Sequence, residues 1–405
     1  MTGPPLDAAG PSPELLRARA FMSRVAEPGH WALWRFVEQY GPIDAVRAIV
    51  AGTVPDDVAA VTAARRDRTD PDADLDVAAR HGIRLLVPES ARWPTTAFAA
   101  LQRAATAAGA ARRVELMAMA TPPLALWVKG SLDEALPVRS VAIVGSRSST
   151  AYGDAVAAEL AFGLARRGVV VISGGAFGID AAAHRAALAA EGATVIVSAG
   201  GLDRPYPAAH ANLFERVAHA GALISESPPG TAPQRHRFLS RNRLIAALAG
   251  GTVVVEAALR SGALNTAAHC VNQGRPLMVV PGPVTSGRSA GCHALLRREG
   301  YSALLVESVD DVIGVVGRIS EVAVRTAVNT NTGSDMSRRG RLDSVDALAR
   351  RVFDGLPARG SISVERLASR CGFDIREVIR ALPVLEMAGL VERDESGVRI
   401  AVELG

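Results

Sequence analysis

Arginines are crowded into one short stretch of this 405-residue chain, RHRFLSRNRLIAAL at residues 235–248. Four of them fall within nine positions, and an apolar, helix-like run follows directly. From Ser227 to Arg298 there are nine arginines against a single acid, Glu256, a net charge of +8, whereas the whole chain carries +4. Positive charge concentrated in this way indicates an anionic partner rather than a solubilising surface.

Two Gly-rich strand ends are further candidates for binding an anion. They are VAIVGSRSSTAYGDAVA at 141–157 and VVVISGGAFGIDAAAHRAA at 169–187. In each, small residues end a strand and a helix follows, so that unpaired backbone N–H groups and a positive helix end converge on phosphate. The candidate residues here are Gly145, Ser146, Arg147, Ser173 and Gly174. The alternative is that these glycines serve only tight turns.

The arginine-rich stretch predicts a helix that begins near Phe238 to Ser240, with Arg241 and Arg243 in its first turn. Cations at a helix N-terminus oppose the macrodipole, and no acid lies nearby in the sequence to offset them. A bound phosphate would satisfy the dipole and the arginines together. The alternative is pairing inside the fold with acids at other strand ends, namely Asp180, Asp203 or Glu226.

The elements that position these residues change along the chain. Residues 1–80 have the apolar spacing of helices and predict a small helical domain, either a SAM-like domain or a plain packing domain. Over 81–315, eight β-branched runs alternate with Ala-rich stretches, which predicts an α/β fold with a doubly wound parallel sheet covered on both faces. Ligands of such sheets bind at the carboxyl ends of the strands.

The end of the chain predicts a separate small domain. Residues 316–343 contain NTNTGSDMS and are expected to be a linker. Residues 344–405 show three short helical patterns followed by two strands, which predicts a winged helix-turn-helix. From Arg341 onward, ten arginines face eleven acids, so we expect this domain to contact protein rather than duplex DNA.

Composition narrows the class of protein. The three cysteines show no metal-ligand spacing, so neither a zinc site nor a disulfide framework is expected, and no cofactor is predicted. There is no signal-peptide pattern and no long apolar run, so we expect a cytoplasmic protein without membrane association.

Three enzymatic or cofactor motifs are weak. The GGxxG at residues 174–178 departs from the dinucleotide fingerprint GxGxxG and has no acid about 20 residues on. The GxSxG at 287–291 does not directly follow a strand, as a nucleophile elbow must. Glu256 ends a strand without a partner acid or base. We therefore expect no catalytic residues and no metal ligands.

Taken together, the motifs resemble those of the DNA-processing protein A (DprA/Smf) family. The matching segments are IVGSR, SGGAFGIDAAAH, GGLDRPYP, ISESPPG, FLSRNRLIAAL, VVVEA with RSGALNTA, and VPGPV. The resemblance covers residues 81–315 closely and the two ends in outline. It implies an extended Rossmann fold that binds single-stranded DNA and delivers it to the RecA recombinase in natural transformation, as a homodimer and without catalytic turnover.

Single residues follow from the same resemblance. Arg147 would bind phosphate, Arg235 would be a basic DNA contact, and Phe238 would contact a base. Phe238 could instead be a core residue. The RNR motif and the RSG segment complete the expected DNA site, with residues Arg241, Asn242, Arg243, Ser261 and Gly262.

The chain departs from the family pattern in two places. The chain has FLSRNR where the family usually has FPxRNR. It has GCHALL where the family usually has GTNxLI, so His293 occupies the position at which an asparagine is expected.

Two other functions remain as alternatives. GGTVVVEA is a partial cue for a nucleotide phosphoribohydrolase of the lysine-decarboxylase-like Rossmann group, but its glycines precede a strand rather than a helix. A duplex-binding regulator that uses the winged helix is disfavoured by the acidic tail.

Overall fold

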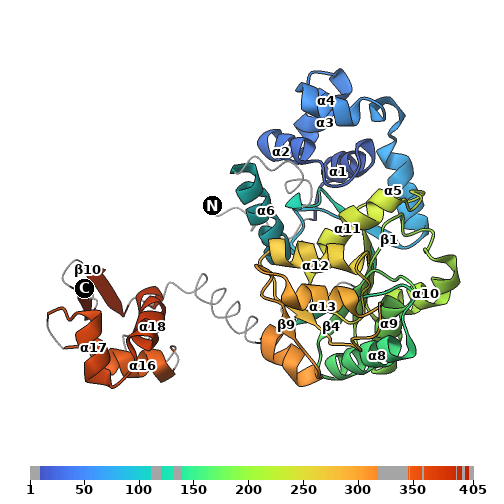
Figure 1. Cartoon of the computed structure of the whole chain (residues 1–405). Coiled ribbons are helices and arrows are strands. Elements are labelled where there is room, and N and C mark those ends of the chain that lie inside the picture. Colours follow the sequence, from blue (N-terminus) through green and yellow to red (C-terminus); the bar gives the residue numbers. More distant parts are fainter. Residues whose placement is uncertain are drawn as a thin grey trace. The chain divides into compact units, whose positions relative to one another are not determined.

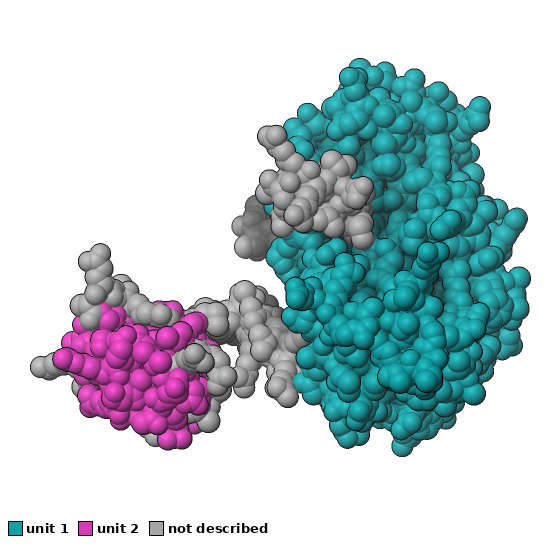
Figure 2. All heavy atoms as spheres, viewed as in Figure 1, with its two compact units in different colours: residues 1–325 teal, residues 326–405 magenta. Residues whose placement is uncertain are grey.

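The chain is described by a computed structural model that covers residues 10–110, 120–131, 139–317, 345, 347–357, 360–388, 390–394 and 397–400. It forms two compact units, Met1–Arg325 and Thr326–Gly405 (Figure 2). The expected linker at 316–343 lies outside the described residues from 318 onward. The expected domain boundary at residue 80 stays a prediction. In the part of the chain that is described, no helix is long and apolar enough to cross a membrane.

Helices fill the N-terminal part of the first unit (Figure 1). Ser12 caps the first helix by accepting a hydrogen bond from the Leu15 N–H, and Asp70 caps the last in the same way. Buried side chains such as Phe21, Met22 and Leu33 form a local core between these helices. The helices are α1 (Pro13–Val25), α2 (Trp31–Tyr40), α3 (Pro42–Ala51), α4 (Asp56–Thr62), the 3₁₀ turn η1 (Arg66–Arg68) and α5 (Pro71–Arg80).

A nine-stranded sheet forms the centre of this unit, in the order β1-β2-β6-β5-β4-β3-β7-β8-β9. The seven strands from β6 to β9 are parallel, which confirms the predicted doubly wound α/β class. Their bounds are β1 (Ile83–Leu86), β2 (Leu126–Gly130), β3 (Ser140–Val144), β4 (Val170–Ser173), β5 (Thr194–Val197), β6 (Ala222–Ser225), β7 (Gly251–Val254), β8 (Leu277–Val279) and β9 (Leu304–Leu305).

Strand direction at one edge differs from the expectation. We expected all the apolar runs to lie parallel, but β2 runs antiparallel to β6 and β1 runs antiparallel to β2. The pattern could not reveal this, because Leu126, Trp127 and Val128 of β2 are buried on both faces and the alternation typical of an antiparallel strand is lost. The short edge strand β9 was not predicted.

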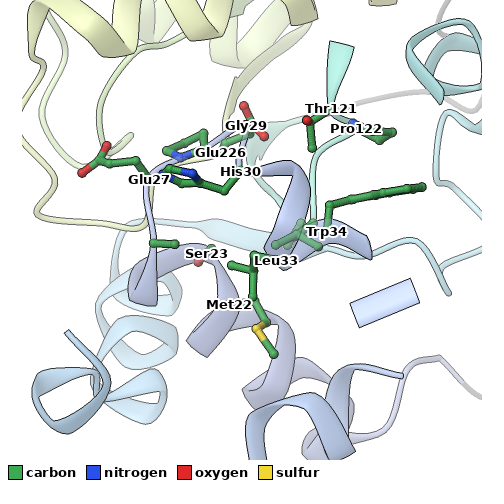
Figure 3. Close-up of a pocket in the computed structure, with 14 residues that line it drawn as sticks. Met22, Ser23, Glu27, Gly29, His30, Leu33, Trp34, Thr121, Pro122 and Glu226 are labelled. Carbon is green, nitrogen blue, oxygen red and sulfur yellow. The ribbon is translucent and has the colours of Figure 1, made fainter. Parts of the chain in front are cut away.

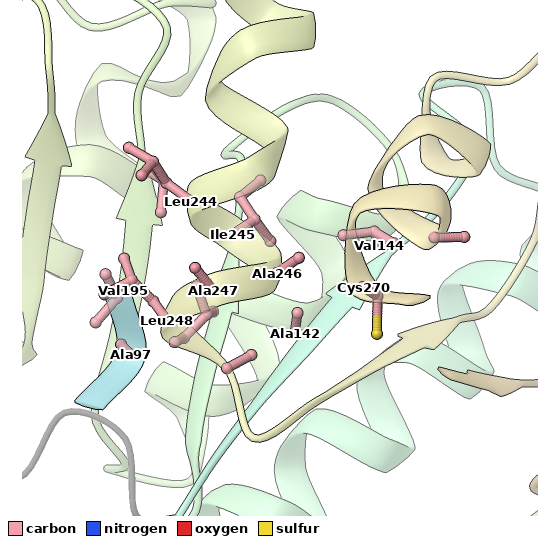
Figure 4. Packing of buried hydrophobic residues seen from close by; sticks show 14 of the residues in the cluster. Ala97, Ala142, Val144, Val195, Leu244, Ile245, Ala246, Ala247, Leu248 and Cys270 are labelled. Carbon is pink, nitrogen blue, oxygen red and sulfur yellow. The ribbon is translucent and has the colours of Figure 1, made fainter. Parts of the chain in front are cut away.

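Helices cover both faces of the sheet because successive side chains of each strand point to opposite sides. On β3, Ala142 and Val144 join a core with α6, α11, α12 and α13, whereas Val141 and Ile143 join a core with α8 and α9. Figure 4 shows the first of these cores. The helices are α6 (Thr95–Ala110), α8 (Ala151–Arg166), α9 (Ile179–Ala189), α10 (Ala211–Ala220), α11 (Arg235–Leu248), α12 (Ala263–Asn272) and α13 (Ala290–Arg297).

Helix α11 is held against the sheet by a buried ion pair as well as by apolar packing. All its residues from Arg241 to Leu248 are buried. The guanidinium of Arg243 is fully buried and donates two hydrogen bonds to the Glu226 carboxylate, at 2.6 and 2.7 Å. Glu226 directly follows β6, so the pair joins the middle of α11 to the carboxyl end of a strand.

The second unit contains the three helices and the strand pair that the sequence predicts. These are α16 (Ala347–Asp354), α17 (Val364–Cys371), α18 (Ile375–Met387), β10 (Val391–Asp394) and β11 (Gly397–Ile400). The two strands pair antiparallel, and buried residues such as Val352, Leu367 and Leu385 form a core of their own.

The Arg243–Glu226 pair leads to a prediction about stability. In Arg243→Met, the Glu226 carboxylate loses its partner while it stays buried, and loss of one partner of such a pair costs about 3–5 kcal/mol. We expect the free energy of unfolding, measured by urea titration, to fall by about this amount. Arg216→Met on the exposed face of α10 is the matched control and should leave it within about 0.5 kcal/mol. Equal stability of the two variants would contradict a structural role for Arg243.

Candidate nucleic-acid interface

An open cleft of about 800 Å³ lies at the carboxyl edge of the sheet. Its walls come from the loop after β3, the start of α11, the segment 258–266 and Arg288. Nine of the twelve residues expected at the site line this cleft. They are Gly145, Ser146, Arg147, Arg235, Phe238, Arg241, Asn242, Ser261 and Gly262.

Three expected residues do not line the cleft. Arg243 is engaged by Glu226, which is the internal pairing that the sequence left open as an alternative, so the expected direct contact with phosphate is corrected to a structural role. The Ser173 hydroxyl is buried and donates to the Ile143 carbonyl at 2.6 Å. Gly174 lies behind the wall, where a side chain would come within 2.5 Å of the Arg241 guanidinium.

Four exposed arginines surround the cleft: Arg147, Arg235, Arg260 and Arg288. Among the described residues, no carboxylate forms an ion pair with any of them. The Arg288 guanidinium donates to Ser146 Oγ at 3.4 Å and to the Ser148 carbonyl, so it joins the loop after β8 to the loop after β3. Phosphate is a suitable partner for such cations, because guanidinium groups bind it with paired N–H donors.

Arg260 and Arg288 were not assigned to the site from the sequence. Both belong to the basic segment Ser227–Arg298, and this membership is the sequence feature that could have indicated them as site residues. Their positions on the rim depend on the conformations of the loops that follow β7 and β8, and sequence patterns do not predict these conformations.

An aromatic ring lies among these cations. The guanidinium carbon of Arg147 is 4.9 Å from the centroid of the Phe238 ring, and that of Arg241 is 5.9 Å away. Tyr206 lies beside Phe238, with ring centroids 5.6 Å apart, and is 49% exposed. Phe238 is therefore not a core residue, and both rings are accessible to an unstacked base. Tyr206 was not predicted, although it belongs to the GGLDRPYP loop.

Arg241 is anchored in the wall of the cleft rather than on its rim. Its side chain is buried and donates to the carbonyl groups of Gly174, at 3.1 Å, and Val197. Burial lowers the pKa of Arg241 to about 10, while the nearby Asp180 carboxylate opposes this effect. The group therefore stays charged at neutral pH and adds fixed positive potential to the cleft. Its neighbour Asn242 also lines the cleft and donates to Asn265 Oδ1 at 3.0 Å.

The two helix ends expected to bind phosphate already have internal partners. Glu256 accepts from the Thr150 N–H at 2.9 Å and from its hydroxyl at 2.8 Å, at the start of α8. Asp180, in the first turn of α9, accepts from the N–H groups of Gly174 and Ala176 at 3.1 and 3.3 Å. Burial raises the pKa of Asp180. The expectation that these N–H groups wait for phosphate was wrong, because carboxylates from within the fold occupy them.

The start of α11 also differs from the prediction. The helix begins at Arg235, three residues before the expected start, so Arg241 and Arg243 lie beyond its first turn. The arginines in that turn are instead Arg235 and Arg237, with His236 between them. No acid of α11 offsets the two arginines of this turn, but Glu27 of the N-terminal region contacts both His236 and Arg237.

The alternative enzymatic functions gain no support from this geometry. Gly251 and Thr252 are the first residues of β7, so the GGT segment does not form a loop-to-helix junction. Glu256, the acid of the same segment, is occupied at the α8 cap. Ser289 is buried and lies ten residues after the end of β8. No group of acids, histidines and cysteines in the described residues could hold a metal ion.

Comparison with known proteins identifies the chain. The family model "DNA recombination-mediator protein A" matches residues 88–317, and the model "DprA winged helix domain" matches residues 338–397. The putative DNA processing protein DprA of Mycobacterium tuberculosis is 47% identical over 378 residues, which cover 93% of this chain and 92% of the relative. Protein Smf of Escherichia coli is 35% identical over 278 residues, 68% of this chain and 71% of that protein.

A solved structure agrees with these sequence matches. The X-ray structure of DNA processing protein A from Streptococcus pneumoniae has a TM-score of 0.58 and 27% sequence identity, covering 75% of this chain and 98% of that one. Sequence, fold and domain order thus lead to the same assignment. The chain belongs to the DNA recombination-mediator protein A (DprA/Smf) family.

Proposed function

We propose that this protein binds single-stranded DNA in the cleft without regard to sequence and delivers it to the RecA recombinase during DNA processing in natural transformation. The observation that carries the proposal is the set of four exposed arginines around the cleft, none of which forms an ion pair with a carboxylate of the described residues. They lie around the half-buried ring of Phe238 and the exposed ring of Tyr206. Arginines bind the phosphate backbone, which is the same for every sequence, and aromatic rings stack on any base.

The aromatic residues favour a single strand over a duplex. Stacking on Phe238 or Tyr206 needs a base whose face is exposed, and base pairs in a duplex cover these faces with their neighbours. Membership in a family of DNA-processing proteins supports the same ligand.

The remaining parts of the proposal rest on family membership. We propose that the protein acts as a homodimer in the cytoplasm, protects the strand and turns over no substrate. On this proposal the strand is handed to a partner and is not chemically changed. Its affinity for the cleft should fall steeply with salt, because binding to arginines releases counterions from the phosphates.

The rim arginines give a prediction for the salt dependence of binding. Each phosphate contact that is lost should reduce the slope of log affinity against log salt by about 0.7 for a single strand. We expect Arg147→Gln and Arg260→Gln each to lower affinity for every oligonucleotide sequence tested and to reduce the slope by this amount in fluorescence anisotropy titrations. Arg216→Gln on α10 removes the same charge outside the cleft and should leave the slope unchanged. An unaltered slope in the rim variants would remove these arginines from the interface.

Phe238 is predicted to stack on a base. Phe238→Leu keeps an apolar side chain but removes the ring, and loss of one stacked base costs about 1–3 kcal/mol of binding free energy. We expect this loss for single strands with an unchanged salt slope. Phe162→Leu replaces a 45% exposed ring on α8 and serves as the control. Equal loss for an abasic and a normal strand would contradict stacking.

The C-terminal unit is expected to serve protein contacts. Its acidic balance and its separate core predict that deletion of residues 341–405 leaves single-strand affinity within about twofold. Anisotropy titration of the full chain and the truncated chain compares the two directly. Loss of DNA binding in a truncated chain with an unchanged melting temperature would overturn this assignment.

A further inference from the structure

The segment between β6 and α11, residues 226–234, reaches the cleft at Pro233, and α11 begins directly after it. Two residues at the end of α1 and just after it contact this part of the chain. The Arg24 guanidinium donates to the Pro229 carbonyl at 2.7 Å. The Glu27 carboxylate accepts two hydrogen bonds from Arg237, at 2.8 and 2.7 Å, in the first turn of α11. The N-terminal region therefore contacts both the segment and the first turn of α11.

Glu27 is the centre of this contact. It also accepts from Arg65, and His236 Nε2 lies 3.1 Å from its other oxygen. Hydrogen bonds from Arg237 are the largest of several effects that hold the pKa of Glu27 far below its ordinary value. The carboxylate is therefore charged at neutral pH. Figure 3 shows Glu27, His30 and Glu226 around the small pocket at this junction.

The position of Glu27 explains how α11 tolerates its basic start. Arg235 and Arg237 oppose the dipole of their own helix, and α11 has no acid in its first turn. Glu27 supplies the missing negative charge from another part of the chain. Arg235 and Phe238 lie on either side of the two residues that Glu27 contacts, and both line the cleft.

We propose that Glu27 is a positioning residue for DNA binding, through which the N-terminal helices hold the first turn of α11 so that Arg235 and Phe238 face the strand. Glu27 does not line the cleft, and it acts through Arg237. The inference rests on the proposed function and assigns a role to the N-terminal helices.

The direction in which Glu27→Gln changes DNA affinity distinguishes a positioning role from a purely electrostatic one. Removal of a carboxylate near a polyanion site strengthens DNA binding if the carboxylate acts only through its charge. If Glu27 orders the turn, Glu27→Gln weakens binding, because the bound strand must then order Arg235 and Phe238 itself. We expect affinity to fall by about threefold to tenfold, the cost of immobilising one or two side chains. The salt slope stays unchanged, because the phosphate contacts remain.

Glu14→Gln is the matched control. Glu14 is an exposed acid of the same helical region; it pairs with Arg47 of α3 and does not line the cleft, so its loss should leave affinity unchanged or slightly higher. Affinity is measured by anisotropy on the full chain, and thermal unfolding shows whether each variant is folded. Stronger or unchanged binding by Glu27→Gln overturns the inference.

A double-mutant cycle tests the route through Arg237. In the Arg237→Gln background, Glu27→Gln should have only a small further effect on affinity, since its two hydrogen bonds from Arg237 are already lost and only its contact with His236 remains on the helix. A full additional loss would show that Glu27 acts by another route and would overturn the inference. Failure of the unmodified protein to bind single-stranded DNA would instead refute the proposed function, so the two failures are distinguishable.

Discussion

Helix α11 is fixed by carboxylates that come from outside it. Glu226 after β6 holds Arg243 in the interior, and Glu27 after α1 holds Arg237 at the first turn. Both contacts are bidentate, so they fix the orientation of the helix as well as its position. Because these two arginines are fixed inward, Arg235, Phe238 and Arg241 are left on the side of the cleft.

The arginines of the basic segment thus have two different physical roles. Arg237 and Arg243 are neutralised within the fold and contribute to its geometry. Arg147, Arg235, Arg260 and Arg288 lie at the surface without a described carboxylate partner, and Arg241 projects fixed charge into the cleft from a buried position. A flexible polyanion could meet several of these exposed cations at once, whereas the internal pairs fix α11, the helix that carries Arg235.

The acids of the site follow the same division. Glu256 accepts hydrogen bonds from Thr150, the N-cap residue of α8, and Asp180 accepts from the Gly174 and Ala176 N–H groups in the loop after β4. These backbone donors therefore have partners within the fold. In the proposed function, binding of a strand relies on the side chains at the rim of the cleft.

Sequence patterns alone were enough to predict the α/β class, the three-helix and two-strand tail, the basic segment and nine of the residues around the cleft, because these depend on local periodicity, charge count and motif. Tertiary structure decided the antiparallel edge of the sheet, since doubly buried strands look alike in either direction. It also decided which arginines remain open. Arg241 and Arg243 are two residues apart in one motif, yet Arg243 pairs with Glu226 at the end of the preceding strand and Arg241 faces the cleft. A charge count contains no information on such pairing. Glu226 lies 17 residues from Arg243 and Glu27 lies 210 residues from Arg237, and only the fold brings each acid to its arginine.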